Sequence, residues 1–265
     1  MPQVTTATLM QMKQQGDKIA VLTSYDASFT RLLENAGVEV ILVGDSLGMV
    51  IQGQESTLPV AVEEMVYHTR CVARSRRSAL LIADMPFMSY SSAKQALDTA
   101  GRLMKDGGAQ MVKLEGGATQ LETVRQLTEN GIPVCAHLGL LPQSVHKLGG
   151  YRVQGKDEAA AQIMREDALS LEASGAQMLV LECVPAPLAT DISKALSIPV
   201  IGIGAGAGCD GQVLVVYDML GITEGPLPRF VKDFLADADS VEGAITAYVK
   251  AVKKGAFPGP KQSFL

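Results

Sequence analysis

Eight short runs rich in Val, Ile and Leu recur along this chain of 265 residues, and they restrict its fold more than any other feature. A near-continuous apolar run is typical of a parallel strand covered on both faces, because neither face of such a strand meets water. The runs predict eight strands, at residues 19–26, 38–46, 79–87, 109–116, 133–140, 176–184, 199–206 and 211–220.

Segments with apolar residues at the helical period lie between most of these runs. They occupy residues 61–77, 92–106, 120–130, 157–174, 186–196 and about 229–254. Eight strands alternating with helices in ~250 residues predict a single (β/α)8 TIM barrel. The barrel is expected to span 1–265 as one domain, with extra N-terminal and C-terminal helical segments, because no change of composition divides the chain. An open, doubly wound sheet is the main alternative.

Charge and hydropathy exclude several classes of protein. The net charge is −5 and Lys and Arg cluster only briefly, so no nucleic-acid partner is expected. The longest uncharged stretches are interrupted by Pro and Gly, so no membrane span is expected either. The first residues lack the apolar core of a signal peptide, which favours a cytoplasmic protein. Cys71, Cys135, Cys183 and Cys209 show no CxxC spacing, so they are expected to be buried, reduced thiols.

A glycine-rich segment, 202–207, fits the GxGxxG/A pattern of dinucleotide-binding proteins. That pattern has to open a helix, and the next strand run begins at Gly211 without room for one. The interpretation preferred here is that small residues let a ligand approach the seventh strand.

Charged or titratable residues stand at the carboxyl ends of several runs. Such a residue needs a cavity or a partner when it follows a buried strand. In a barrel these strand ends meet at the active-site mouth. Any one acid could be a rim residue in a salt bridge, but the set together predicts one polar site. Its members are Asp45, Ser46, Asp84, Lys113, Glu115, His137 and Glu182.

The two-residue period of a strand sharpens this prediction. If Glu115 points into the barrel, Lys113 and Met111 point inward as well. The same argument places Val180 on the same side as Glu182.

Two carboxylates on neighbouring strands, Asp45 and Asp84, suit Mg²⁺, which often takes only one or two protein carboxylates and keeps several waters. Glu115 could bind such an ion directly or through water. Zn²⁺ is not favoured, because the three histidines lack an HxxxH-type spacing. A divalent ion can chelate a 2-oxo acid and acidify the C–H beside its ketone. Glu182 could then remove that proton, while Lys113 offsets the enolate charge and Ser46 binds the substrate carboxylate.

Longer motifs surround these residues. They include VGDSLGM (43–49), ADMPFMSY (83–90), MVKLEGG (111–117), PVCAHLGLLPQSV (133–145), LVLECVP (179–185) and IPVIGIGAG (198–206). With them the chain resembles the ketopantoate hydroxymethyltransferase family over most of its length. The resemblance implies a (β/α)8 barrel that uses Mg²⁺ and 5,10-methylenetetrahydrofolate as co-substrate. The implied reaction converts 3-methyl-2-oxobutanoate to 2-dehydropantoate in pantothenate biosynthesis.

The resemblance also implies roles for individual residues. Metal ligands would be Asp45, Asp84 and Glu115. Substrate-binding residues would be Asp45, Ser46, Asp84, Lys113 and His137. The proton acceptor would be Glu182. It further implies a cytoplasmic homo-oligomer, usually a decamer. The tail GAFPGPKQSF (255–264) carries Pro-Lys-Gln where the family commonly has acidic residues or His, which puts a tail-mediated subunit contact in doubt.

Other functions stay open at this point. One is a metal-dependent lyase or aldolase acting on another small 2-oxo acid. Another is a Schiff-base aldolase that uses Lys113 as its nucleophile. A third is a ligand-binding barrel without catalysis. Two long connections, 47–60 and 141–156, are lid candidates, with a variable surface loop as the alternative, and the second is expected on the folate side.

Overall fold

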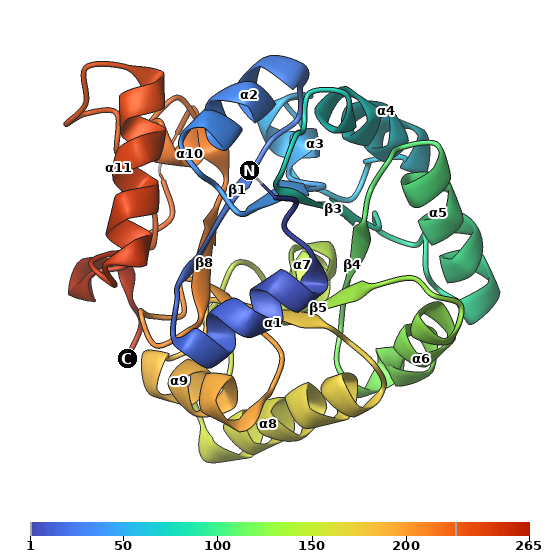
Figure 1. Cartoon of the computed structure of the whole chain (residues 1–265). Helices are drawn as coiled ribbons and strands as arrows, with labels where there is room; N and C mark the ends of the chain where they lie inside the picture. Colours follow the sequence, from blue (N-terminus) through green and yellow to red (C-terminus); the bar gives the residue numbers. More distant parts are fainter. Residues whose placement is uncertain (1, 226) are drawn as a thin grey trace.

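The computed structural model describes residues 2–225 and 227–265. Eight parallel strands close into a barrel in chain order, from β1 to β8, which pairs back with β1 (Figure 1). The strands are β1 Ile19–Thr23, β2 Val40–Val43, β3 Leu80–Asp84, β4 Met111–Glu115, β5 Val134–Gly139, β6 Met178–Glu182, β7 Val200–Ile203 and β8 Gly211–Leu214. The predicted TIM barrel is confirmed, and the open sheet is wrong.

Helices surround the barrel (Figure 1). They are α1 Thr6–Gln15, α2 Ala27–Asn35, α3 Leu47–Val50, α4 Val62–Ala73, α5 Ala93–Lys105, α6 Leu121–Glu129, α7 Val145–Leu148, α8 Glu158–Ala173, α9 Ala186–Ala195, α10 Val216–Met219 and α11 Val241–Lys253, with 3-10 turns η1 Ala118–Gln120, η2 Pro142–Ser144 and η3 Pro260–Gln262. Within the described residues, no helix has both the length and the apolar character that a membrane crossing requires. All four cysteines are free thiols, and Cys71 alone is only partly buried.

The C-terminal helix is shorter than the predicted segment 229–254. It begins at Val241, where the Ser240 hydroxyl accepts a hydrogen bond from the Gly243 N–H. Upstream, the Asp233 carboxylate accepts hydrogen bonds from the N–H groups of Leu235 and Ala236. Between them, the Phe234 N–H donates to the Met219 carbonyl and the Phe234 ring packs against Tyr248 and Phe257, so long-range contacts hold this segment outside a helix.

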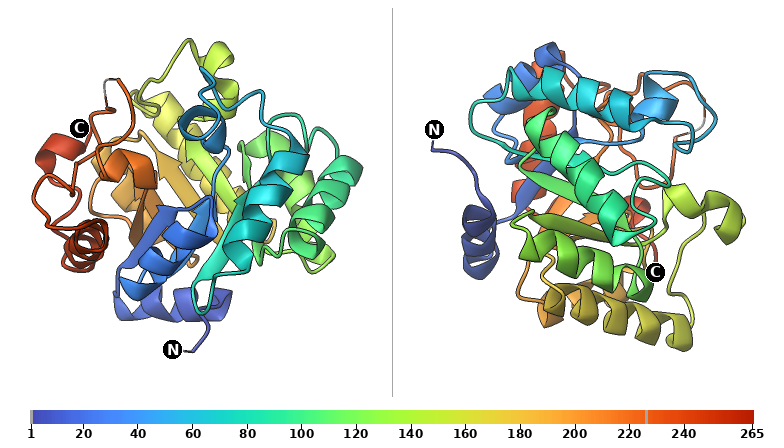
Figure 2. Two further views of the ribbon diagram at one scale, coloured as in Figure 1. Left: turned by 90° about the horizontal axis from the view of Figure 1, so that it is seen from above. Right: turned by 90° about the vertical axis from the view of Figure 1, so that its right-hand side faces the viewer.

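Apolar side chains fill two separate cores. One lies between the strands and the surrounding helices. The other fills the barrel itself and takes alternate residues of the strands, for example Val40 and Leu42, or Met178 and Val180. Leu9 of α1 belongs to this inner core, so α1 closes the N-terminal end of the barrel. Figure 2 shows α1 at the opposite end from α7, which follows the carboxyl end of β5.

The glycines after β7 contact protein rather than open space. A Cβ added at Gly204 would meet the rings of Phe230 and Phe264, and one at Gly206 would meet Ala186. No helix lies between Ile203 and Gly211, which agrees with rejecting a dinucleotide site. At Gly204 and Gly206 neighbouring side chains take up the space where a Cβ would lie. The approach of a ligand to the seventh strand stays a prediction.

Glu34, at the end of α2, ties this helix to the turn before β3. Its buried carboxylate accepts hydrogen bonds from the N–H groups of Arg77, Ser78 and Ala79. Partial burial alone would raise the pKa of Glu34, but these N–H donors and Arg77 lower it below its ordinary value. Since the folded pKa lies below the unfolded one, the stabilisation is present above the unfolded pKa of about 4.3 and is lost as pH falls through the folded pKa.

We therefore expect Glu34→Gln to lower the free energy of unfolding at neutral pH by about 1–3 kcal/mol. The difference from the wild type should shrink in acid, where Glu34 itself is protonated. Urea titrations at several pH values measure both quantities. Glu122→Gln is the control. Among the described residues Glu122 pairs with neighbours on its own exposed helix face, so the effect of its substitution should be near zero. An equal effect of both substitutions would contradict this account.

Candidate active site

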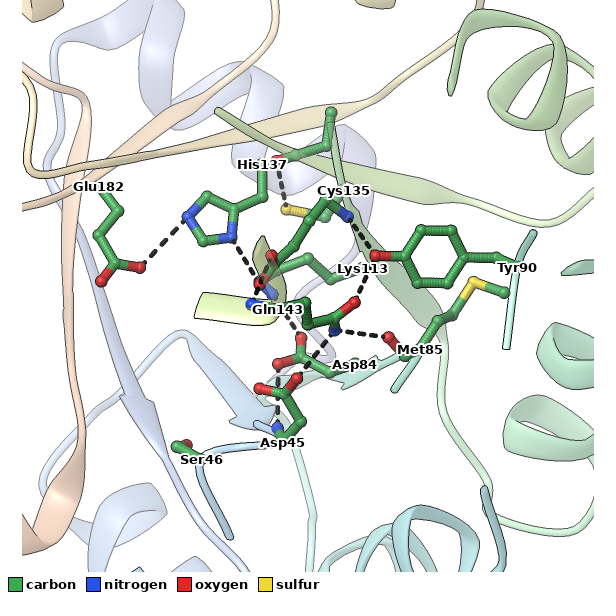
Figure 3. A network of polar contacts seen from close by, with 12 residues as sticks. Asp45, Ser46, Asp84, Met85, Tyr90, Lys113, Cys135, His137, Gln143 and Glu182 are labelled. Carbon is green, nitrogen blue, oxygen red and sulfur yellow. Dashed lines mark hydrogen bonds and ion pairs between the residues drawn. The ribbon is translucent and has the colours of Figure 1, made fainter. Parts of the chain in front are cut away.

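Charged side chains meet inside the barrel at the carboxyl ends of β3 to β6 (Figure 3). In the strand register, Asp84 of β3 pairs with Lys113 of β4, and Glu115 of β4 pairs with His137 of β5. Lys113 and Glu115 share a face with Met111, which lies in the inner core. The predicted inward set of β4 is therefore present in the structure.

Asp45 and Asp84 lie side by side, although they are 39 positions apart in the chain. Asp84 Oδ2 accepts a hydrogen bond of 3.0 Å from the Asp45 N–H. Asp84 Oδ1 forms an ion pair of 2.8 Å with Lys113 Nζ. All three residues are at least 95% buried, since their exposed fractions are 4%, 3% and 5%. Gly44 makes this turn possible, because a Cβ there would lie 2.7 Å from Ser46 Oγ.

Negative charge exceeds positive charge around Lys113. Burial, followed by the charges of Asp84 and Glu115, raises the pKa of Asp45 well above its ordinary value. Burial alone would lower the pKa of Lys113, but the same three carboxylates raise it, so the amine stays protonated. One ammonium therefore faces three carboxyl groups, all of them at least 95% buried. A bound cation would offset the remaining charge.

The donor atoms fit a hard divalent cation. Asp84 Oδ1 is buried and, within residues 2–225 and 227–265, has the Lys113 ion pair but no hydrogen bond. In the same described residues, no three His, Cys, Asp or Glu side chains form a complete ligand group. Mg²⁺ tolerates this, because it commonly binds through two carboxylates, water and substrate oxygens.

His137 links Glu115 to Glu182. Its Nδ1 lies 3.6 Å from Glu115 Oε1, and its Nε2 lies 3.3 Å from Glu182 Oε2. Burial alone would lower the pKa of His137, but the two carboxylates raise it to about 9. Near neutral pH the ring is thus an imidazolium held between two acids. Glu182 is the more open of the two, with 13% of its side chain exposed against 3% for Glu115.

Two neutral residues complete the site. The Gln143 N–H donates to Glu115 Oε2 at 3.1 Å, and its side-chain amide donates to Asp45 Oδ2 at 2.8 Å. The Tyr90 hydroxyl donates to Gln143 Oε1. Charge patterning missed both residues because neither is ionised. The only sequence signal for them was their position in the motifs ADMPFMSY and PVCAHLGLLPQSV.

Ser46 stands at the edge of this cluster (Figure 3). Its hydroxyl lies 2.9 Å from the Tyr25 hydroxyl, and that pair forms a separate polar patch next to Asp45. Burial raises the pKa of Tyr25, so its hydroxyl stays neutral and can donate a hydrogen bond. Of the predicted residues, Asp45, Asp84, Lys113, Glu115 and His137 thus form one connected group. Glu182 joins it through His137, and Ser46 flanks it.

Comparisons with known proteins cover nearly the whole chain. Residues 3–260 match the family model described as ketopantoate hydroxymethyltransferase. A protein of Halorhodospira halophila named 3-methyl-2-oxobutanoate hydroxymethyltransferase is 59% identical over 98% of this chain and 94% of its own length. Proteins with the same name are 61% identical in Nitrosococcus oceani (97% of this chain, 98% of the relative) and 57% identical in Aeromonas salmonicida (100% of both).

Solved structures with a similar barrel are far more distant in sequence. A phosphoenolpyruvate phosphomutase from Streptomyces platensis subsp. rosaceus has a TM-score of 0.62 and 13% identity, with 82% of each chain covered. A 2,3-dimethylmalate lyase has a TM-score of 0.59 and 17% identity, covering 83% of this chain and 81% of that one. These likenesses concern the fold. The match along residues 3–260, together with relatives of 57–61% identity, shows that this chain belongs to the ketopantoate hydroxymethyltransferase family.

Proposed function

We propose that this protein transfers a hydroxymethyl group from 5,10-methylenetetrahydrofolate to 3-methyl-2-oxobutanoate, giving 2-dehydropantoate for pantothenate biosynthesis. The observation that carries the proposal is the buried Asp45–Asp84–Lys113 cluster at the barrel mouth of a chain in this family. With a divalent cation offsetting its excess negative charge, this cluster suits a small anion with two adjacent oxygen donors, such as a 2-oxo acid.

Mg²⁺ is the cofactor that this cluster fits. Asp45 and Asp84 would hold it, with Glu115 as a direct or water-mediated ligand. When bound, the ion supplies Lewis-acid polarisation of a ketone, which acidifies the neighbouring C–H. Asp84 would take part both in binding the ion and in holding Lys113, because Asp84 Oδ1 pairs with Lys113 Nζ.

The chain's own residues then bind the substrate and move the proton. Ser46 and Tyr25 donate hydrogen bonds to the substrate carboxylate. Lys113, kept protonated by its neighbours, offsets the negative charge that develops on the ketone oxygen. Glu182 takes the proton from C3 of the substrate, and the resulting carbon nucleophile forms a C–C bond to the methylene carbon of the folate. The bonds from this carbon to the two folate nitrogens break, and water supplies the hydroxyl oxygen, so tetrahydrofolate is the second product. His137 beside Glu182 holds that carboxylate in place.

The connection between β5 and α8 is the proposed cover on the folate side. Tyr151 from this connection has its hydroxyl 3.9 Å from Met49 Sδ of α3. Two segments that flank the mouth therefore meet above the acids. By family likeness the protein is also proposed to be a cytoplasmic homo-oligomer, a decamer, with the 2-oxo acid and the folate as its small-molecule partners.

Among the alternatives, the Schiff-base aldolase is the least compatible with the site. An imine requires a neutral amine, whereas the carboxylates around Lys113 keep it protonated. Borohydride should therefore fail to trap substrate on the protein. A metal-dependent lyase or aldolase acting on another 2-oxo acid remains the second candidate, because the same cluster would serve bond cleavage.

The decisive assay combines the protein with 3-methyl-2-oxobutanoate, 5,10-methylenetetrahydrofolate and Mg²⁺, and identifies the product by mass spectrometry. We expect 2-dehydropantoate, with activity lost in EDTA and restored by Mg²⁺. Cleavage of a 2-oxo acid without hydroxymethyl transfer would favour the lyase. Binding of the 2-oxo acid without any turnover would favour a ligand-binding barrel.

A further inference from the structure

The last residues of the chain pack against the wall of the active-site mouth. The Phe264 carbonyl accepts a hydrogen bond of 2.8 Å from the N–H of Ala186, the first residue of α9, and the C-terminus lies beside α9 in Figure 1. The Phe264 ring packs on Gly204, where an added Cβ would lie 3.1 Å from it. The Arg229 guanidinium covers the ring at 5.4 Å from its centroid.

This contact replaces a missing helix cap. A helix leaves its first N–H groups without partners, and a side chain of the N-cap residue usually accepts from one of them. The N-cap of α9 is Pro185, which has no such side chain. The tail carbonyl from Phe264 takes this role from the far end of the chain. The Phe264 ring at the same time contacts the residue after β7, so one residue joins the start of α9 to the end of β7.

The turn between β6 and α9, held in this way at its α9 end, directly follows Glu182, the last residue of β6. Cys183, the next residue, has a φ of 49°, a left-handed conformation that costs a residue with a side chain about 1 kcal/mol or more. The Glu182 carbonyl accepts a hydrogen bond of 2.8 Å from the Leu140 N–H. The Cys183 N–H donates to the Ile203 carbonyl at 2.9 Å. A turn with a strained residue keeps its conformation only when surrounding contacts stabilise it. Phe264 supplies one such contact at Ala186, where the turn after Glu182 ends.

We propose that Phe264 is a positioning residue for Glu182. Its carbonyl fixes Ala186 and its ring fixes Gly204, so the turn that follows Glu182 keeps the carboxylate aimed into the mouth. The proposal rests on the role of Glu182 as proton acceptor. The tail thus contributes to proton abstraction without touching the substrate.

The test compares Phe264→Ala with Leu265→Ala, since Leu265 is the neighbouring residue and is fully exposed. Exchange of the C3 proton of 3-methyl-2-oxobutanoate with D2O, followed by NMR in the presence of Mg²⁺, reports on Glu182 directly. We expect Phe264→Ala to slow exchange and kcat by about 10- to 100-fold, because a displacement near 1 Å can cost that much. The KM for the 2-oxo acid should change by less than about 2-fold, since it depends on residues away from this turn.

Phe264→Tyr should restore exchange, because it keeps the aromatic ring that holds the tail, and with it the backbone carbonyl, in place. Leu265→Ala should match the wild type. Normal exchange in Phe264→Ala would overturn the proposal. Slower exchange that returns to the wild-type rate at saturating 2-oxo acid would also overturn it, because the defect would then lie in substrate binding.

If Phe264→Ala fails to fold, Arg229→Ala replaces it, since it uncovers the ring and removes the hydrogen bond to the Lys261 carbonyl. That variant should slow exchange several-fold, and unchanged exchange would equally overturn the proposal. A wild-type protein that does not exchange the proton would overturn the proposed function first, and this inference with it.

Discussion

Replacing Asp84 by asparagine is expected to lower kcat/KM for hydroxymethyl transfer by a factor on the order of 10³. The Asp84 carboxylate contacts two other members of the cluster, Asp45 through its N–H and Lys113 through its Nζ. Asparagine can still accept the first of these bonds but has no charge with which to hold Mg²⁺. The loss should therefore concern ion and 2-oxo acid binding rather than the fold.

Thermal unfolding with and without Mg²⁺ distinguishes a loss of ion binding from a loss of folding. An ion that binds only the folded protein raises its melting temperature, and this rise should disappear in Asp84→Asn. Asp210→Asn is a matched control, because Asp210 also pairs with a lysine, Lys13, at 2.7 Å, but at the other end of the barrel. The control should lose about 1–3 kcal/mol of stability and keep both activity and the response to Mg²⁺. An Asp84→Asn protein that still responds to Mg²⁺ would exclude Asp84 as a ligand.

The barrel was predictable because each of its strands is a near-continuous apolar run, which the local sequence shows directly. The local sequence also shows which residues of a strand share a face, because side chains alternate along it. Lys113 and Glu115 share the inner face of β4 with Met111, as the two-residue period requires. The conformation of the connections between strands was harder to predict from the sequence. Residues 229–240 have an apolar pattern that suits a helix, yet long-range contacts of Phe234 with Met219 and Tyr248 hold the segment in turns.

The charged part of the candidate site was predictable for the same reason, since a charge at the end of a buried strand must face a cavity. Gln143 and Tyr90 were not, because an uncharged polar residue in a connection gives no such signal. Their contacts depend on how η2 and the segment after β3 cross the mouth. The tail contact of Phe264 was equally inaccessible, because it joins residues 78 positions apart in the chain.

Replacing Glu182 by glutamine should separate proton abstraction from binding. Glutamine has the same shape and cannot accept the C3 proton, so exchange of that proton with solvent should fall by about 10²- to 10⁴-fold. Hydroxymethyl transfer should fall by the same factor if this proton must leave first. Glu182 lies against His137, away from Asp45 and Asp84, so Mg²⁺ and the 2-oxo acid should still raise the melting temperature.

Glu172→Gln provides the control for this experiment. Glu172 is a glutamate of α8 whose carboxylate accepts hydrogen bonds from the N–H groups of Ser197 and Ile198. These two residues precede β7, so Glu172 lies at the amino ends of the strands, opposite the mouth. Its substitution should alter stability and leave exchange unchanged. Exchange that persists in Glu182→Gln would remove Glu182 as the base even if transfer were lost, because the defect would then lie in the later attack on the folate. Exchange lost together with the ligand-induced stabilisation would instead mean that Glu182 binds the substrate.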